Sequence, residues 1–189
     1  MSSSDDPHPD GGGAGDGRIR VDRGDITQAR VDAIVNAANS ALRRGGGVDG
    51  AIHRAAGPAL QDELDRIGGC PTGECRVTRG HALPAPWLLH CVGPVWQGGG
   101  RGEDALLERC YRSAFAAARR LGLRRLAFPA ISPGIFGFPR ERAAAIALAA
   151  VRDELAATPA VTEVRFVCFD AETAGIYQRL LGAAGGGAG

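Results

Sequence analysis

The chain has 189 residues, of which 44% are hydrophobic and 23% are charged, the usual balance of one globular domain. Its formal net charge of +1 excludes a large single-sign electrostatic field, which argues against bulk attraction to nucleic acid or to a membrane surface. All 22 basic residues are arginines, so chemistry that depends on a lysine, such as a P-loop lysine or a Schiff base, is excluded.

The two ends of the chain have a composition that cannot form a packed core. Residues 1–17 are mostly Ser, Asp, Pro and Gly, and residues 183–189 are Gly and Ala. Such segments bury too little apolar surface to offset their ordering entropy. We therefore predict disordered tails on either side of a single domain that spans residues 18–182.

Apolar runs and helical periodicities alternate along the domain. Short apolar runs predict strands at 33–35, 87–92, 126–128 and 164–169, alternation predicts one at 19–21, and 76–78 is a weaker candidate. Apolar residues at three-and-four spacing predict helices at 104–121, 139–155 and 172–181, and two further helices are predicted at 49–56, after a glycine loop, and at 58–67, which begins with proline. This alternation is typical of an α/β sandwich with a largely parallel sheet. Ligands bind beyond the carboxyl ends of the strands of such sheets.

The location of the chain and the state of its cysteines can be predicted together. The polar, acidic start is unlike a secretory signal, and no apolar run approaches the roughly 20 residues that a membrane helix needs. The five cysteines are odd in number, and no pair has the C-x-x-C spacing of a zinc set. We expect a cytoplasmic protein with reduced thiols at Cys70, Cys75, Cys91, Cys110 and Cys168.

Two glycine-rich loops are candidates for holding phosphate. The first, Arg43 to Gly50, contains three successive glycines and leads into a predicted helix. The second, Ile131 to Pro139, lies between a predicted strand and a helix and carries two aromatic residues. Glycines let the backbone approach a ligand closely, and a helix N-terminus adds partial positive charge. Two such loops at one sheet end suit the two sides of a diphosphate.

Several polar side chains near these loops allow either a structural or a functional interpretation. Asp49 is placed to cap a helix, or to orient and deprotonate a water molecule beside a phosphate. Asn36 and Asn39 follow a strand, where they satisfy a turn or bind sugar hydroxyls. Asp25 is either a turn residue or an acceptor for an exocyclic amine such as that of adenine. His53 lies four residues after Asp49, where packing in the core is favoured over a His–carboxylate dyad.

Two further candidates have mainly structural explanations. Ser132 lacks the G-x-S-x-G context of a nucleophile elbow, so we interpret it as a loop residue. Four arginines cluster near a predicted helix end, where interaction with the helix dipole is favoured over RNA binding. These are Arg119, Arg120, Arg124 and Arg125.

Taken together and in order, these motifs resemble the macrodomain family, in particular its MacroD type. The resemblance covers residues 18–182 and rests on Gly24-Asp25-Ile26-Thr27, Val31 to Asn39, Gly45 to His53, Ala55 to Pro58, Cys70 to Gly73, His90 to Pro94, Phe128 to Ser132, Gly134 to Pro139 and Phe166 to Asp170. It implies a three-layer α/β/α sandwich with a central mixed, largely parallel six-stranded sheet. It also implies an ADP-ribose cleft at one end of that sheet, with no metal and no cofactor.

The resemblance implies a role for each candidate residue. Asn39 would orient the distal ribose and Asp49 would position or activate the attacking water, while Asp25 would take the adenine amine and Phe169 would pack on its ring. The full set expected to contact the ligand is Asp25, Ile26, Asn36, Gly45, Gly46, Gly47, Val48, Ser132, Gly134, Ile135, Phe136 and Phe169.

The chain departs from the family pattern in both glycine loops. Arg44 stands where the family usually has a glycine, and would kink the first loop or reach an outer phosphate oxygen. Pro133 stands where threonine is usual, which removes one backbone donor, and Phe136 and Phe138 stand where tyrosine is also common. These changes affect rate and affinity more than fold.

The resemblance implies a hydrolase that binds ADP-ribose and cleaves an ester on its distal ribose. Its substrate would be O-acetyl-ADP-ribose, a protein that carries mono-ADP-ribose on acidic side chains, or both. The alternative is a reader that binds ADP-ribose without catalysis, since a shared fold does not determine function. A third hypothesis, an RNA- or poly(A)-binding module, is disfavoured by the near-neutral net charge.

Overall fold

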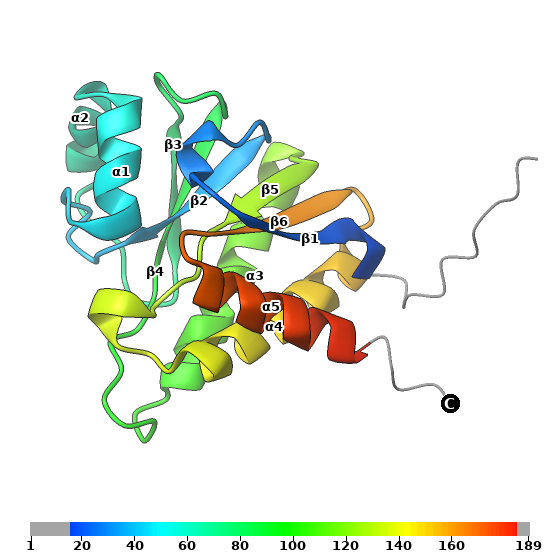
Figure 1. Ribbon diagram of the computed structural model, residues 1–189. Coiled ribbons are helices and arrows are strands. Elements are labelled where there is room, and N and C mark those ends of the chain that lie inside the picture. The colour runs from blue at the N-terminus through cyan, green and yellow to red at the C-terminus, as the bar shows by residue number, and fades with distance from the viewer. Residues whose placement is uncertain (1–15, 185–189) are drawn as a thin grey trace, which may run out of the picture.

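A six-stranded mixed sheet forms the centre of the computed structural model, which describes residues 16–184 (Figure 1). The strands are β1 (Ile19–Arg23), β2 (Ala33–Ala38), β3 (Cys75–Arg79), β4 (Trp87–Val92), β5 (Arg125–Phe128) and β6 (Glu163–Cys168). Their order is β1-β6-β5-β2-β4-β3, and only the β3–β4 pairing is antiparallel. All six predicted strands are present, and the predicted largely parallel sheet is confirmed.

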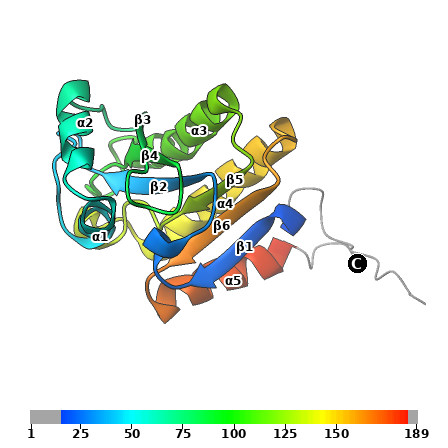
Figure 2. The same ribbon diagram turned by 90° about the horizontal axis from the view of Figure 1, so that it is seen from above.

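Five α-helices cover the two faces of the sheet, as Figure 2 shows from above. They are α1 (Gly47–Ala56), α2 (Ala59–Ile67), α3 (Glu103–Leu121), α4 (Arg140–Ala157) and α5 (Ala171–Ala184). The buried residues of α3, α4 and α5 share one hydrophobic cluster, and those of α1 and α2 share another. The three-layer sandwich expected from the sequence is therefore confirmed.

Consecutive residues of the central strands alternate between the two clusters. In β2, Val35 contributes to the cluster under α3, α4 and α5, whereas Ile34 packs under α1 and α2. In β4, Leu89 and Leu88 divide in the same way. Because successive strand side chains point to opposite faces, a strand buried on both sides must be apolar almost throughout. This is why the strands appear in the sequence as continuous apolar runs.

The described structure extends slightly past the predicted domain. A short 3-10 helix, η1 (Asp16–Arg18), precedes β1, and α5 continues to Ala184. Arg18 secures this start, because its guanidinium donates to the carbonyls of Val161 and Leu155. Most of the two predicted tails, residues 1–15 and 185–189, lies outside the described residues. No helix within residues 16–184 has the length and apolar character needed to span a membrane.

The prediction of five reduced thiols is wrong for two of them. Cys75 and Cys91 face each other across the antiparallel β3–β4 pair and form a disulfide, with their Cα atoms 4.1 Å apart. Cys70, Cys110 and Cys168 are free and buried. Burial raises the pKa of Cys110 to about 12 and that of Cys168 to about 11, so both thiols stay protonated near neutral pH. The disulfide depends on the register of β3 against β4, which the spacing of the cysteines in the sequence does not reveal.

Candidate functional site

A cavity of about 750 Å³ opens at the carboxyl ends of β1 and β6, beside α1. Its wall comes from the segments that follow these strands and from α1, and consists of Arg23, Gly24, Asp25, Ile26, Gly47, Val48, Ala51, Arg54 and Phe169. We call it the first cavity. Its volume lies in the range of small-molecule and cofactor sites. Asp25, Ile26, Gly47, Val48 and Phe169 were all predicted from the sequence, and the fold brings them together here.

The lining of the first cavity includes an exposed ring and a free carboxylate oxygen. Phe169 follows β6 and is 85% exposed, an unusual state for a large apolar side chain. Asp25 caps the 3-10 helix η2 (Ile26–Gln28), where its Oδ1 accepts from both the backbone N–H and the hydroxyl of Thr27. Within residues 16–184 its Oδ2 has no hydrogen-bond partner. An aromatic face and a free acceptor in the wall of one cavity suit a planar base with an amino group.

The N-terminus of α1 forms another part of the wall. The helix begins after Gly46 without a side-chain cap, so its first backbone N–H groups have no intrahelical partner. Gly47 has φ +57°, a left-handed conformation that favours glycine. Arg23 and Arg54 add positive charge to the same cavity. Unpaired amides, a helix dipole and two guanidinium groups together suit an anionic diphosphate.

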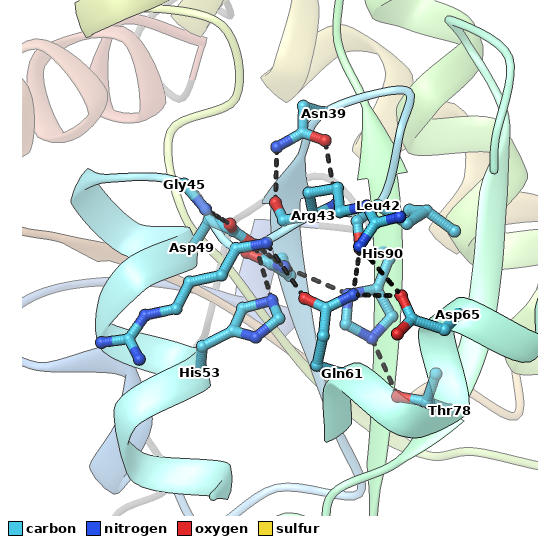
Figure 3. A network of polar contacts seen from close by, with 12 residues as sticks. Asn39, Leu42, Arg43, Gly45, Asp49, His53, Gln61, Asp65, Thr78 and His90 are labelled. Carbon is cyan, nitrogen blue, oxygen red and sulfur yellow. Dashed lines mark hydrogen bonds and ion pairs between the residues drawn. The ribbon is translucent and has the colours of Figure 1, made fainter. Parts of the chain in front are cut away.

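Asp49 lies behind this helix terminus and is held from two sides (Figure 3). Its Oδ2 accepts from the backbone N–H of Gly45 at 2.6 Å, and its Oδ1 accepts from Asn36 Nδ2 at 2.7 Å. His53 Nε2 lies 3.4 Å from the same Oδ1. Asp49 is only 6% exposed and does not line the first cavity. The carboxylate that was expected to orient or activate water therefore already has two hydrogen bonds.

Asn36 belongs to a buried polar chain instead of the cavity wall. Its Nδ2 donates to Asp49 Oδ1 and also contacts His90 Nδ1 at 3.1 Å, and His90 Nε2 lies 2.8 Å from the Thr78 hydroxyl. Burial, with a smaller contribution from His53, lowers the pKa of His90 to about 3. Asn36 is fully buried and its Oδ1 has no hydrogen-bond partner within residues 16–184, so its expected ligand contact stays a prediction. It orients Asp49.

Asn39 braces the first loop close to Asp49. Its Nδ2 donates to the Arg43 carbonyl at 2.7 Å, and its Oδ1 accepts from the Arg43 N–H at 3.1 Å. A Cβ atom on Gly45 would lie 3.4 Å from Asp49 Oδ2 and 3.6 Å from Asn39 Nδ2. The two residues expected to be catalytic therefore converge on the Gly45 backbone, from opposite ends of the loop.

The second loop follows β5, a parallel neighbour of β2. Both glycine loops therefore leave the sheet at the carboxyl end of its strands. It contains the 3-10 helix η3 (Gly134–Phe136) and is closed by a bond from the Phe138 N–H to the Ser132 carbonyl. Ser132 is buried at φ +72°, and a Cβ on Gly93 would collide with its hydroxyl. Ser132, Gly134 and Phe136 do not line the first cavity. Their expected ligand contacts stay predictions.

Four residues of the cavity wall were not predicted: Arg23, Gly24, Ala51 and Arg54. Two of them carried a usable signal, since Ala51 and Arg54 fall three to four residues apart on the helical face that begins at Gly47 and Val48. The buried partners of Asn36 gave no such signal. His90 and Thr78 come from β4 and β3, and only the strand register places their side chains together.

The comparison with known proteins agrees with this architecture. The family model of the Macro domain matches residues 35–147. A macro domain-containing protein of Cupriavidus necator is 58% identical over 167 residues, which cover 86% of this chain and 96% of the relative. This chain therefore belongs to the Macro domain family.

Two further relatives carry functional names. A Salmonella gallinarum protein named O-acetyl-ADP-ribose deacetylase is 51% identical over 168 residues, which cover 87% of this chain and 94% of the relative. The crystal structure of a Trypanosoma brucei macrodomain in complex with ADP-ribose superposes with a TM-score of 0.82 and 43% identity, covering 86% of this chain and 68% of the other.

Proposed function

We propose that this protein binds ADP-ribose in the first cavity and hydrolyses an ester on the distal ribose. The observation that carries the proposal is the convergence of Asn39 and Asp49 on Gly45, directly before the helix terminus whose amides line the cavity. The names of the Salmonella relative and of the Trypanosoma complex support both halves of it.

Each part of the cavity matches one part of the ligand. Adenine would stack on Phe169 and donate its amino hydrogens to Asp25 Oδ2, while the diphosphate would accept from the N–H groups of Gly47 and Val48. The distal ribose would then lie toward Asn39, whose amide can exchange its Arg43 contacts for sugar hydroxyls. Gly46 and the second loop would complete the diphosphate contacts.

Asp49 is suited to the proton transfers of ester hydrolysis. Each carboxylate oxygen accepts up to two hydrogen bonds, so both Asp49 oxygens retain a lone pair beside their present partners. Water attacks the acyl carbon, its proton passes to the carboxylate, and the same proton protonates the ribose oxygen as the ester C–O bond breaks. The products are a carboxylic acid and ADP-ribose. General acid–base help of this kind accelerates a reaction by roughly 10²- to 10⁴-fold.

Three finer features also belong to the proposal. The acyl group is either acetate or the acidic side chain of a modified protein, no metal takes part, and the protein acts in the cytoplasm. Within residues 16–184 no group of three or more His, Cys, Asp or Glu side chains is arranged to hold a metal ion. Metal independence is tested by incubation with EDTA before the assay. Unchanged turnover is expected, and a loss of turnover that added metal restores would contradict it.

The test is a panel of acetyl, glutamyl, arginyl and seryl ADP-ribose linkages, with ADP-ribose release followed by chromatography. We expect turnover of the acetyl and glutamyl esters and a loss of roughly 100-fold or more in Asp49→Asn. Asp153→Asn, which changes an exposed carboxylate on α4, is the matched control and should keep full activity. Equal turnover by wild type and Asp49→Asn would refute the assignment of Asp49.

A non-catalytic reader is the second candidate, favoured by the burial of Asp49 and by the two hydrogen bonds that already hold it. Calorimetry separates the two functions. Tight binding of ADP-ribose by wild type, with no product formed from any linkage of the panel, would establish the reader and reject the hydrolase.

A further inference from the structure

A second cavity of about 570 Å³ lies between α1 and α2, on another side of α1 from most of the first cavity wall. It is lined by Arg44, His53, Arg54, Gly57, Pro58, Gln61 and Asp62. Arg54 belongs to the walls of both cavities, so the two sites adjoin. Arg44, expected from the sequence to kink the loop or to reach a phosphate oxygen, contributes to this second cavity and not to the first.

The second cavity presents positive charge that the protein does not neutralise. Within the described part of the chain, the guanidinium groups of Arg44 and Arg54 have neither an ion pair nor a hydrogen bond. The lining holds two guanidinium groups and one carboxylate, Asp62, and Arg54 is shared with the first cavity. Arg44 is the cation that belongs to the second cavity alone, and a single carboxylate matches its one charge better than a phosphate dianion does.

Contacts from α2 hold the backbone of Arg44 in place. Gln61 accepts from the Arg44 backbone N–H at 3.1 Å through its Oε1 and donates to the Leu42 carbonyl at 3.0 Å through its Nε2 (Figure 3). A third bond, to Asp65 at 2.9 Å, orients the Gln61 amide itself. The backbone that carries the Arg44 guanidinium is therefore fixed before any ligand binds, which lowers the entropic cost of binding.

The second cavity also reaches the proposed catalytic residues. His53, one of its lining residues, is 6% exposed, its Nε2 has no hydrogen-bond partner within residues 16–184, and that nitrogen lies 3.4 Å from Asp49 Oδ1. Arg44 directly precedes Gly45, on whose backbone Asp49 and Asn39 converge. In the proposed binding mode, with the distal ribose beside Asn39 and Asp49, a chain that extends from its ester toward Arg44 would have this cavity next to it.

We propose that the second cavity binds a carboxylate side chain of an acidic polypeptide whose ester-linked ADP-ribose occupies the first cavity, an inference that rests on the proposed function. The volume of the cavity is far larger than one carboxylate needs, and the wall formed by Gly57 and Pro58 is available to the aliphatic part of a glutamate and to its backbone. A free acetyl ester has no group that could use this site.

The binding test uses the ¹⁵N-labelled full chain saturated with ADP-ribose, titrated with the peptide acetyl-Glu-Gly-Glu-amide. We expect amide shifts at Arg44, Gly57 and Asp62, and none with the peptide in which both glutamates are glutamines. Arg44→Gln should weaken the affinity by about two- to fivefold, as expected for a partly exposed charge pair, and Asp62→Asn should strengthen it by a similar factor. Arg43→Gln, the neighbouring arginine outside the cavity, is the matched control and should leave the affinity unchanged.

Equal shifts with the two peptides, no shifts at all, or shifts confined to the first cavity would each overturn the proposal. A kinetic measurement connects the site to catalysis: Arg44→Gln should raise KM for a glutamyl-ADP-ribosylated acidic peptide and leave turnover of O-acetyl-ADP-ribose unchanged. Because peptide binding is measured without turnover, the two failures are distinguishable. Glutamate-dependent binding with no hydrolysis of any ester rejects the proposed function alone, whereas hydrolysis without such binding rejects only the second site.

Discussion

The protonation state of His90 can be derived from its neighbours. An asparagine amide nitrogen is only a donor, so His90 Nδ1 must accept from Asn36 Nδ2, and the ring proton must lie on Nε2, which donates to the Thr78 hydroxyl. Exchanging the amide nitrogen and oxygen of Asn36 would place Oδ1 against Asp49 Oδ1, two acceptors at 2.7 Å. The Thr78 hydroxyl, which accepts from His90 Nε2, donates its own hydrogen bond to the Arg79 carbonyl oxygen. A proton on His90 Nδ1 would break this chain.

Because protonation of His90 is unfavourable in the folded protein, the stability of the fold depends on pH. The pKa of His90 is about 3 in the folded protein, against an ordinary value near 6.5 in the unfolded chain. Between these values the unfolded state binds a proton that the folded state does not, so stability falls as the pH decreases from about 6.5 toward 3. From pH 7 to pH 5 this linkage amounts to about 2 kcal/mol, at about 1.4 kcal/mol for each full pH unit.

Urea unfolding of wild type and His90→Asn at pH 7 and pH 5 measures this contribution. Other titrating groups contribute to both proteins, so the free energy of unfolding should fall by about 2 kcal/mol more in the wild type than in the variant. If the variant does not fold, NMR of the imidazole nitrogens of the wild type provides the test, since they should keep the neutral Nε2–H pattern down to about pH 4. Equal pH dependence of the two proteins, or protonation of His90 near pH 6, would refute the reasoning.

Three further predictions concern ligand binding and stability. Phe169→Ala should weaken ADP-ribose binding by about tenfold in calorimetry without changing the melting temperature, because the exposed ring stacks on a base and packs little against the protein. Gly47→Ala should lower the free energy of unfolding by roughly 1–2 kcal/mol because of its left-handed φ, whereas Gly46→Ala, in extended backbone, should not; equal losses in urea unfolding would contradict this. Reduction of the Cys75–Cys91 disulfide should cost up to roughly 3 kcal/mol for its 16-residue separation, and Cys75→Ala/Cys91→Ala should unfold identically with and without reductant.

The arrangement of the strands was predictable because burial on both faces leaves a direct trace in the sequence. The run at 33–35 is apolar throughout, and the run at 87–92 is apolar apart from His90. Both form central strands in which consecutive residues pack into the two separate clusters. The first loop was predictable for a related reason. Three glycines before an amphipathic segment can only be a flexible turn into a helix, and Gly47 indeed takes a positive φ there.

Contacts that depend on strand register could not be predicted from the sequence. Asn36 was expected to contact a ligand because it ends an apolar run, but nothing in the sequence indicated that its neighbour across the parallel β2–β4 pair is His90, whose Nδ1 contacts the Asn36 amide nitrogen. The disulfide was missed in the same way, since Cys75 and Cys91 become partners only when β3 pairs antiparallel to β4. In both cases local spacing says nothing about which residues from distant segments lie opposite each other.

The same contacts explain how Asp49 can have both a structural role and the proposed role in catalysis. Its bond to the Gly45 N–H closes the first loop over four residues, and its bond to Asn36 ties that loop to β2 and, through His90, to β4 and β3. A carboxylate fixed from two sides loses little freedom when a water molecule takes one of its remaining lone pairs, so the reorganisation needed for catalysis is small. The burial of Asp49 is thus compatible with the proposed general-base chemistry, which requires one water molecule to reach a free lone pair of its carboxylate beside the bound ribose.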